Sequence, residues 1–186
     1  MPVSQFMSLC LSDPTHGYYM TRDPLGRSGD FITSPEVSQM FGELIGIWCA
    51  SVWRMMGSPE NVRLIELGPG RGTMMLDILR AARVVPEFRN AVVVHMVEVS
   101  PALQARQKQT LGGIDVPVLW HNAFEDVPEG PHAVTLSGAG LTTVSTEETI
   151  EKGKKLTKGK LAYVLSADAR RRSDPDPNPI RGSISL

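Results

Sequence analysis

A glycine-rich loop is the part of this sequence whose residue types and spacing could do chemistry. Gly68, Gly70 and Gly72 follow the apolar run 62–67 and precede a helical pattern over 73–84. Glycines at this spacing let the backbone turn tightly and approach a ligand at the N-terminus of a helix and the C-terminal edge of a sheet. The loop therefore predicts a ligand site; a tight strand–helix turn without a ligand is the alternative.

Glu98 strengthens this prediction because it closes the next predicted strand, roughly one strand–helix–strand unit further along the chain. An acid at that position can accept hydrogen bonds from the two ribose hydroxyls of an adenosine. A solvated carboxylate at the end of a strand is the alternative. A dinucleotide loop would have a third glycine at position 73, where this chain has Thr73, so an NAD-dependent oxidoreductase is disfavoured.

A second group of polar residues lies in the segment 29–36, ahead of the glycine loop. The hydroxyls of Thr33 and Ser34 and the free amides beside them can close over a ligand, and Asp30 or Glu36 can meet a cationic group. The alternative is that Asp30 and Ser34 cap a helix while Glu36 complements the helix dipole.

The hydrophobic spacing predicts the elements that must position these residues. Helices are expected over 34–57, 73–84 and 101–111, with Pro86 ending the second, and strands over 62–67, 91–99, 116–120, 131–136 and 161–166. This alternation predicts an α/β fold with a parallel sheet.

The composition excludes several classes of function. The chain has 186 residues, a formal net charge of −1 and 41 % hydrophobic residues, which is typical of one globular domain. The near-neutral charge favours no nucleic-acid partner, and no apolar stretch is long enough to span a membrane. The four histidines lack metal-ligand spacing; His95 is predicted in the core or on a face of the sheet, and His121, after the third strand, is a candidate for lining the ligand pocket. Cys10 and Cys49 are predicted to be buried thiols.

Several sequence blocks occur in the order typical of one enzyme family. They are HGYYM at 16–20, GDFITSPEVSQMFGE at 29–43, ELGPGRGT at 66–73, VEVSP at 97–101 and EDVP at 125–128. From about residue 2 to 133 the chain resembles the MidA-like family of S-adenosylmethionine-dependent methyltransferases, which is associated with the assembly of respiratory complex I. The resemblance implies a class I, Rossmann-like fold and S-adenosyl-L-methionine as the cofactor.

The resemblance also implies roles for individual residues. The three loop glycines would curve around the amino acid end of the cofactor, Glu66 would help hold its ammonium group, and Glu98 would hold the ribose. The implied reaction is methyl transfer to an arginine of a protein substrate, a complex I subunit. Asp30 and Glu36 are the candidate catalytic carboxylates because carboxylates orient a planar guanidinium, and Thr33 and Ser34 are candidate cofactor contacts.

The resemblance fails after the fourth predicted strand, where residues 131–140 lack the family's Asn-Glu-aromatic-aromatic-Asp type of motif. We therefore predict a helical segment over 1–58, a cofactor-binding half-domain over 59–136 and a divergent tail over 137–186 that is largely disordered from about 168. A sheet truncated in this way would expose the first or fourth strand as an edge, which predicts a marginally stable chain unless a partner covers it.

Two functional hypotheses follow from these observations. The first is a methyltransferase, and the second is a non-catalytic assembly module with a vestigial cofactor loop. Since the sequence begins without a recognisable targeting segment, the bacterial cytoplasm is the expected location, with the mitochondrial matrix as the expectation for a eukaryotic chain.

Overall fold

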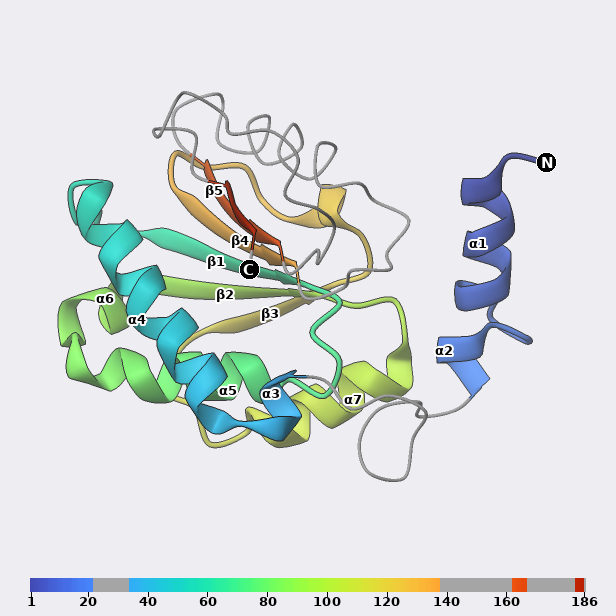
Figure 1. Ribbon diagram of the computed structural model, residues 1–186, viewed down its shortest axis with the longest axis horizontal. Helices are drawn as coiled ribbons and strands as arrows, with labels where there is room; N and C mark the ends of the chain where they lie inside the picture. The colour runs from blue at the N-terminus through green and yellow to red at the C-terminus, as the bar shows by residue number, and fades with distance from the viewer. Residues whose placement is uncertain (22–33, 138–161, 167–182, 186) are drawn as a thin grey trace.

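The fold is an α/β sandwich built on one parallel sheet. A computed structural model describes residues 1–21, 34–137, 162–166 and 183–185 (Figure 1). Its six strands have the order β3-β2-β1-β4-β5-β6, and every neighbouring pair is parallel. The strands are β1 (Val62–Leu67), β2 (Val92–Val97), β3 (Val118–His121), β4 (Ala133–Ser137), β5 (Ala162–Ser166) and β6 (Ser183–Ser185). The predicted fold class is confirmed.

Helices precede and connect these strands. They are α1 (Val3–Ser12), α2 (Tyr18–Thr21), α3 (Ser34–Val37), α4 (Gln39–Met55), α5 (Thr73–Ala81), α6 (Pro86–Ala91) and α7 (Pro101–Thr110), with short 3-10 turns at Ala82–Val84 and Phe124–Asp126. In Figure 1, α4, α5 and α7 lie together on one side of the sheet.

The centre of the sheet is β1, because β2 and β3 extend it in one direction and β4, β5 and β6 in the other. The strand order therefore reverses between β1 and β4, and parallel sheets bind ligands at the carboxyl ends of the strands at such a reversal. The predicted exposed edge at the first or fourth strand is wrong. In this sheet β1 is paired on both sides and β5 covers β4, so the outer strands are β3 and β6.

The main core lies between the sheet and helices α4 and α5. Alternate residues of β1, β2 and β4 point into it, and they include Leu64, Val94 and Val134, which are almost fully buried. A smaller cluster on the opposite face joins Ile65 and Ala133 to the segment after β3. The period-two alternation of the strands thus separates two packed faces.

The helices α4 and α5 approach each other closely at two glycines. A Cβ atom added to Gly42 would lie 2.6 Å from the Cβ of Asp77, and one added to Gly46 would lie 2.8 Å from the carbonyl oxygen of Ile78. Both distances are shorter than real Cβ contacts, so the side chain of any other residue would push the helices apart.

Three local predictions agree with the structure only in part. The helix predicted over 34–57 is two helices, α3 and α4, separated by Ser38 in an extended conformation. The helical run 73–84 does stop before Pro86, as predicted, but its last turn, Ala82–Val84, is 3-10, and Pro86 also occupies the first turn of a further helix, α6, that was not predicted. Cys10, predicted to be buried, is exposed on α1, whereas Cys49 is buried as expected.

The tail predicted to be largely disordered from about residue 168 lies mostly outside the described residues. Within it the structure describes only β6, which pairs in parallel with β5.

Candidate functional site

The glycine loop connects the carboxyl end of β1 to the first turn of α5. Gly68, Gly70 and Gly72 have φ angles of 62°, 56° and 80°, in the left-handed region that glycine adopts without strain. The N–H of Gly68 donates to the carbonyl of Val97 at 3.0 Å, so the loop begins beside the end of β2. Gly72 is the N-cap of α5 and provides no side-chain cap, which leaves the amides of the first turn available to a ligand.

Glu98 lies directly after β2, at the same edge of the sheet. Its N–H donates to the carbonyl of His121 at 2.9 Å, which fixes the residue beside the end of β3. One carboxylate oxygen, Oε1, accepts a hydrogen bond from the N–H of Ser100 at 2.9 Å. The side chain is only 7 % exposed, and burial raises the pKa of its carboxyl group.

Gln107, a residue that the sequence reasoning missed, joins Glu98 to the glycine loop. Its Nε2 donates to the carbonyl of Gly70 at 2.8 Å and to Oε2 of Glu98 at 3.4 Å. A recognisable signal existed, because Leu103, Gln107 and Leu111 are spaced four residues apart and all three are buried. A polar residue in the middle of an apolar stripe needs buried hydrogen-bond partners.

Glu66 is the buried acid beneath the loop. It lies in register with Met96 of β2 and Leu136 of β4, both almost fully buried, and is itself 2 % exposed. Its Oε2 atom has no hydrogen-bond partner among the described residues. Burial among apolar side chains raises the pKa of Glu66 to about 8. The pKa of the Cys49 thiol is also raised, mainly because the thiol is buried and to a smaller extent because of its interaction with Glu66.

The segment before α4 reaches the glycine loop through an ion pair. Glu36 of α3 lies with Oε1 3.7 Å from Nη1 of Arg71, and both side chains are largely buried. Asp30 and Thr33 lie outside the described residues. Ser34 is the first residue of α3, one position further into the helix than the cap position predicted for it. Glu36 is thus the member of this group that the structure places beside the loop.

Two histidines form a contact on the face of the sheet opposite α5. Nδ1 of His95 lies 2.9 Å from Nε2 of His121, and the two rings are stacked. Burial lowers the pKa of His95 to about 4, and the neighbouring imidazole adds to this effect. His95 is therefore neutral and buried in the core, one of the two places expected for it. Across the described part of the chain, no group of His, Cys, Asp or Glu side chains could hold a metal ion.

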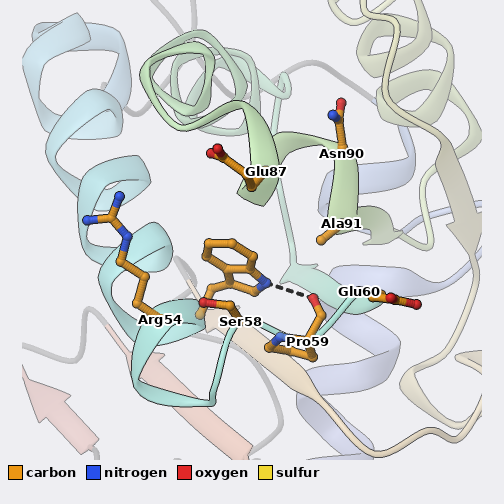
Figure 2. Close-up of a pocket in the computed structure, with 8 residues that line it drawn as sticks. Arg54, Ser58, Pro59, Glu60, Glu87, Asn90 and Ala91 are labelled. Carbon is orange, nitrogen blue, oxygen red and sulfur yellow. Dashed lines mark hydrogen bonds between the residues drawn. The ribbon is translucent and has the colours of Figure 1, made fainter.

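A surface pocket lies at the other end of the sheet. Figure 2 shows Glu60, Glu87 and Asn90 around it, and Nε1 of Trp53 donates to the carbonyl of Pro59 at 2.9 Å within it. These residues come just before the first residues of β1 and β2, so the pocket is at the amino edge of the sheet. It is separate from the glycine loop and Glu98.

Comparison with known proteins shows the family to which this chain belongs. Residues 44–138 match the model of the family described as "Putative S-adenosyl-L-methionine-dependent methyltransferase". The matched range contains the glycine loop, Glu98, Gln107 and the strands β1 to β4. The chain belongs to this methyltransferase family. Its members depend on S-adenosyl-L-methionine, which is the cofactor that the sequence blocks predicted.

Several curated animal proteins are similar to this chain. The chain is 45 % identical over 154 residues to the Drosophila melanogaster protein named "Protein arginine methyltransferase NDUFAF7 homolog, mitochondrial", and 41 % identical over 150 residues to the human protein of the corresponding name. The matches cover 70 % and 69 % of this chain, but 34 % of each relative. The chain therefore spans about a third of the length of these relatives.

A solved structure of a Burkholderia thailandensis protein bound to S-adenosyl-homocysteine is also similar. It has a TM-score of 0.60 and 28 % sequence identity, and the match covers 74 % of this chain and 36 % of that one. A second structure from the same organism has a TM-score of 0.56 and 29 % identity. The methyltransferase fold of the chain thus agrees with its family. Within the described residues, no helix is long and apolar enough to cross a lipid bilayer.

Proposed function

We propose that the chain binds S-adenosyl-L-methionine at the glycine loop and forms the cofactor-binding part of a protein arginine methyltransferase. The observation that carries this proposal is the contact from Gly70 through Gln107 to Glu98. It joins the loop after β1 to the acid after β2 by two hydrogen bonds from one amide group. An amino acid end and a ribose, the two ends of this cofactor, would be held at these two places.

The residues present fit the chemistry of this cofactor. The unpartnered Oε2 of Glu66 is a buried acceptor beneath the loop, suited to an ammonium group. The uncapped first turn of α5 offers amides to a carboxylate. The Glu98 carboxylate receives hydrogen bonds from Ser100, Gln107 and the backbone of Val99, and since a carboxylate has roughly four acceptor positions, acceptor capacity remains for the ribose. When bound, the cofactor supplies a methyl group that its sulfonium already activates.

The work left to the protein is therefore binding, orientation and exclusion of water. The glycine loop and Glu98 would hold the two ends of the cofactor, and the ion pair of Glu36 with Arg71 would hold α3 against the loop. Asp30 and Glu36 remain the proposed carboxylates for orienting a guanidinium, and Thr33 and Ser34 the proposed hydroxyl contacts to the cofactor.

The proposed acceptor is an arginine side chain of a protein, a subunit of respiratory complex I. The names of the animal relatives support an arginine acceptor, and the resemblance to the MidA-like family supports complex I. The names of these relatives include the word "mitochondrial", which supports a mitochondrial location; within the mitochondrion, the matrix is the compartment that we propose.

Calorimetric titration of the chain with S-adenosyl-L-methionine tests the binding proposal. Glu98→Ala should weaken binding by about 1–3 kcal/mol because two ribose hydrogen bonds are lost. Glu60→Ala, an exposed acid at the amino edge of the sheet, is the matched control and should leave affinity unchanged. Equal affinity of the Glu98→Ala variant would remove Glu98 from the site. A chain without measurable affinity would favour the assembly module.

The acceptor is tested by incubating the chain and tritium-labelled cofactor with purified, undermethylated complex I subunits. Label recovered as methylarginine after hydrolysis supports the proposal. Label on other residues, or none while the cofactor still binds, contradicts an arginine acceptor for this chain.

A further inference from the structure

Gln107 is a buried amide in the middle of the helix that covers the glycine loop. Its side chain is fully inaccessible to solvent, and it lies four residues from the buried Leu103 of α7 and four from the buried Leu111, the C-cap of this helix. A Cβ atom on Gly72 would lie 3.4 Å from the Cγ of Gln107, so the side chain packs directly against the loop. Burial of an amide is unfavourable unless its donors and acceptor are all used.

The amide uses all of them on three different elements. Nε2 donates one hydrogen to the carbonyl of Gly70 and the other to Oε2 of Glu98, while Oε1 accepts from Nε1 of Trp120 on β3 at 3.1 Å. The orientation is determined by the partners, because the indole N–H can only donate and the backbone carbonyl can only accept. Glutamine is thus the residue type that satisfies this site.

We propose that Gln107 is a positioning residue that sets the distance between the glycine loop and the Glu98 carboxylate, and thereby the spacing of the two ends of the cofactor site. This inference rests on the proposed function. Oε1 of Glu98 is held by the N–H of Ser100, and Gln107 holds the other oxygen, so the two together fix the carboxylate plane. Trp120 in turn fixes Gln107.

The N–H that Gln107 donates to Glu98 also favours the ionised carboxylate, against the burial that disfavours it. Removing the donor should raise the pKa of Glu98. The charged or titratable side chains on the glycine loop, on α7 and on strands β1 to β3 are Arg63, Glu66, Arg71, His95, Arg106, Lys108 and His121, and none of them is changed in the single variants below.

The first experiment needs no cofactor. Carboxyl carbon NMR of the ligand-free chain measures the pKa of Glu98 in the wild type, in the Gln107→Met variant and in a matched control variant, Gln109→Met. Gln109 is an exposed glutamine on the same helix. We expect Gln107→Met to raise the pKa of Glu98 by about 0.5–1 unit, since the bond lost is long, and Gln109→Met to leave it unchanged. The Trp120 indole N–H resonance should shift only in Gln107→Met.

The second experiment measures the affinity for S-adenosyl-homocysteine from pH 5 to 8. In Gln107→Met the affinity at pH 8 should fall about tenfold, and the pH midpoint should move upward with the pKa of Glu98. In a Glu98→Gln background, Gln107→Met should no longer move the midpoint. Trp120→Phe removes the hydrogen bond from the indole to Gln107 but keeps Gln107 itself, so it should raise the pKa of Glu98 by a smaller amount. This variant replaces Gln107→Met in the test if Gln107→Met does not fold.

The outcomes separate the two proposals. A wild-type chain that does not bind S-adenosyl-homocysteine contradicts the proposed function, while the ligand-free pKa still tests the contact. A folded Gln107→Met or Trp120→Phe variant with the wild-type pKa of Glu98 and the wild-type pH profile overturns the positioning role.

Discussion

Replacing Glu66 by glutamine should stabilise the ligand-free chain, and more so as the pH rises. The carboxyl group of Glu66 lies among apolar side chains with one oxygen unpartnered, so its ionised form is poorly solvated. Its pKa in the folded chain is about 8, compared with an ordinary value of 4.5. Glutamine has nearly the same shape and does not ionise, so it keeps the packing and removes the titration.

The sign and size of the effect follow from proton linkage. Below pH 4.5 the carboxyl group is protonated in the folded and the unfolded chain. Between pH 4.5 and 8 the unfolded chain releases the proton while folded Glu66 retains it, so each pH unit lowers the free energy of unfolding by about 1.4 kcal/mol. From pH 5.5 to 7.5 the wild type should therefore lose about 3 kcal/mol relative to Glu66→Gln. The difference should level off above pH 8.

Urea denaturation followed by fluorescence at half-unit pH steps measures this difference. Glu98 and Asp77, whose pKa values are also raised by burial, are present in both proteins, so their contributions cancel. Glu60→Gln, at an exposed position, should track the wild type at every pH. If the stability difference between wild type and Glu66→Gln is constant from pH 5.5 to 7.5, the buried neutral acid described above does not exist.

Three further predictions concern packing, protonation and thiol reactivity. Gly42→Val should destabilise the chain by about 1–3 kcal/mol in urea, because its side chain meets Asp77 where the helices touch; Gly113→Ala, in open space, should be near neutral. As the pH falls from 6.5 towards 4, His95 becomes protonated in the unfolded chain but stays neutral in the folded chain. The free energy of unfolding of the wild type should therefore fall by up to about 1.4 kcal/mol per pH unit relative to His95→Gln. If the unfolding free energies of the two proteins change in parallel with pH, His95 is not a buried neutral residue. Cys10 should react quickly with a thiol reagent, whereas Cys49 should react only when the chain unfolds. Mass spectrometry of the labelled chain measures both rates, and equal rates at the two cysteines would contradict the prediction.

The elements that the sequence predicts best are those whose signals are local. The glycine spacing and the apolar run before it locate β1 and the start of α5 to the residue. Strands β2 to β5 are found within about two residues, because an apolar run bounded by turn residues is the signature of a covered parallel strand. The place of Glu98 beside the loop follows from this topology alone.

The predictions that failed depend on contacts distant in sequence. Helical spacing continues through Ser38, and only the three-dimensional path of the chain separates α3 from α4. The expectation of an open edge at the first or fourth strand failed because β5 and β6 complete that side of the sheet, and strand pairing is not encoded in the local pattern.

The role of Gln107 is the site feature that sequence reasoning overlooked. Its partners Gly70, Glu98 and Trp120 lie on three separate elements, so the residue spacing within α7 cannot predict these hydrogen bonds. The polar interruption between two buried leucines was the available signal. A search for single polar residues inside apolar stripes would have selected it.

The central position of β1 has a consequence for the newly made chain. The strand that closes its second side, β4, begins about 65 residues after β1 ends. At synthesis rates of 5–20 residues per second, β1 waits roughly 3–13 s with its backbone groups on that side unpaired. During that interval β1, β2 and β3 can already pair with one another, and the free side of β1 is an unpaired strand edge to which another chain could add until β4 arrives.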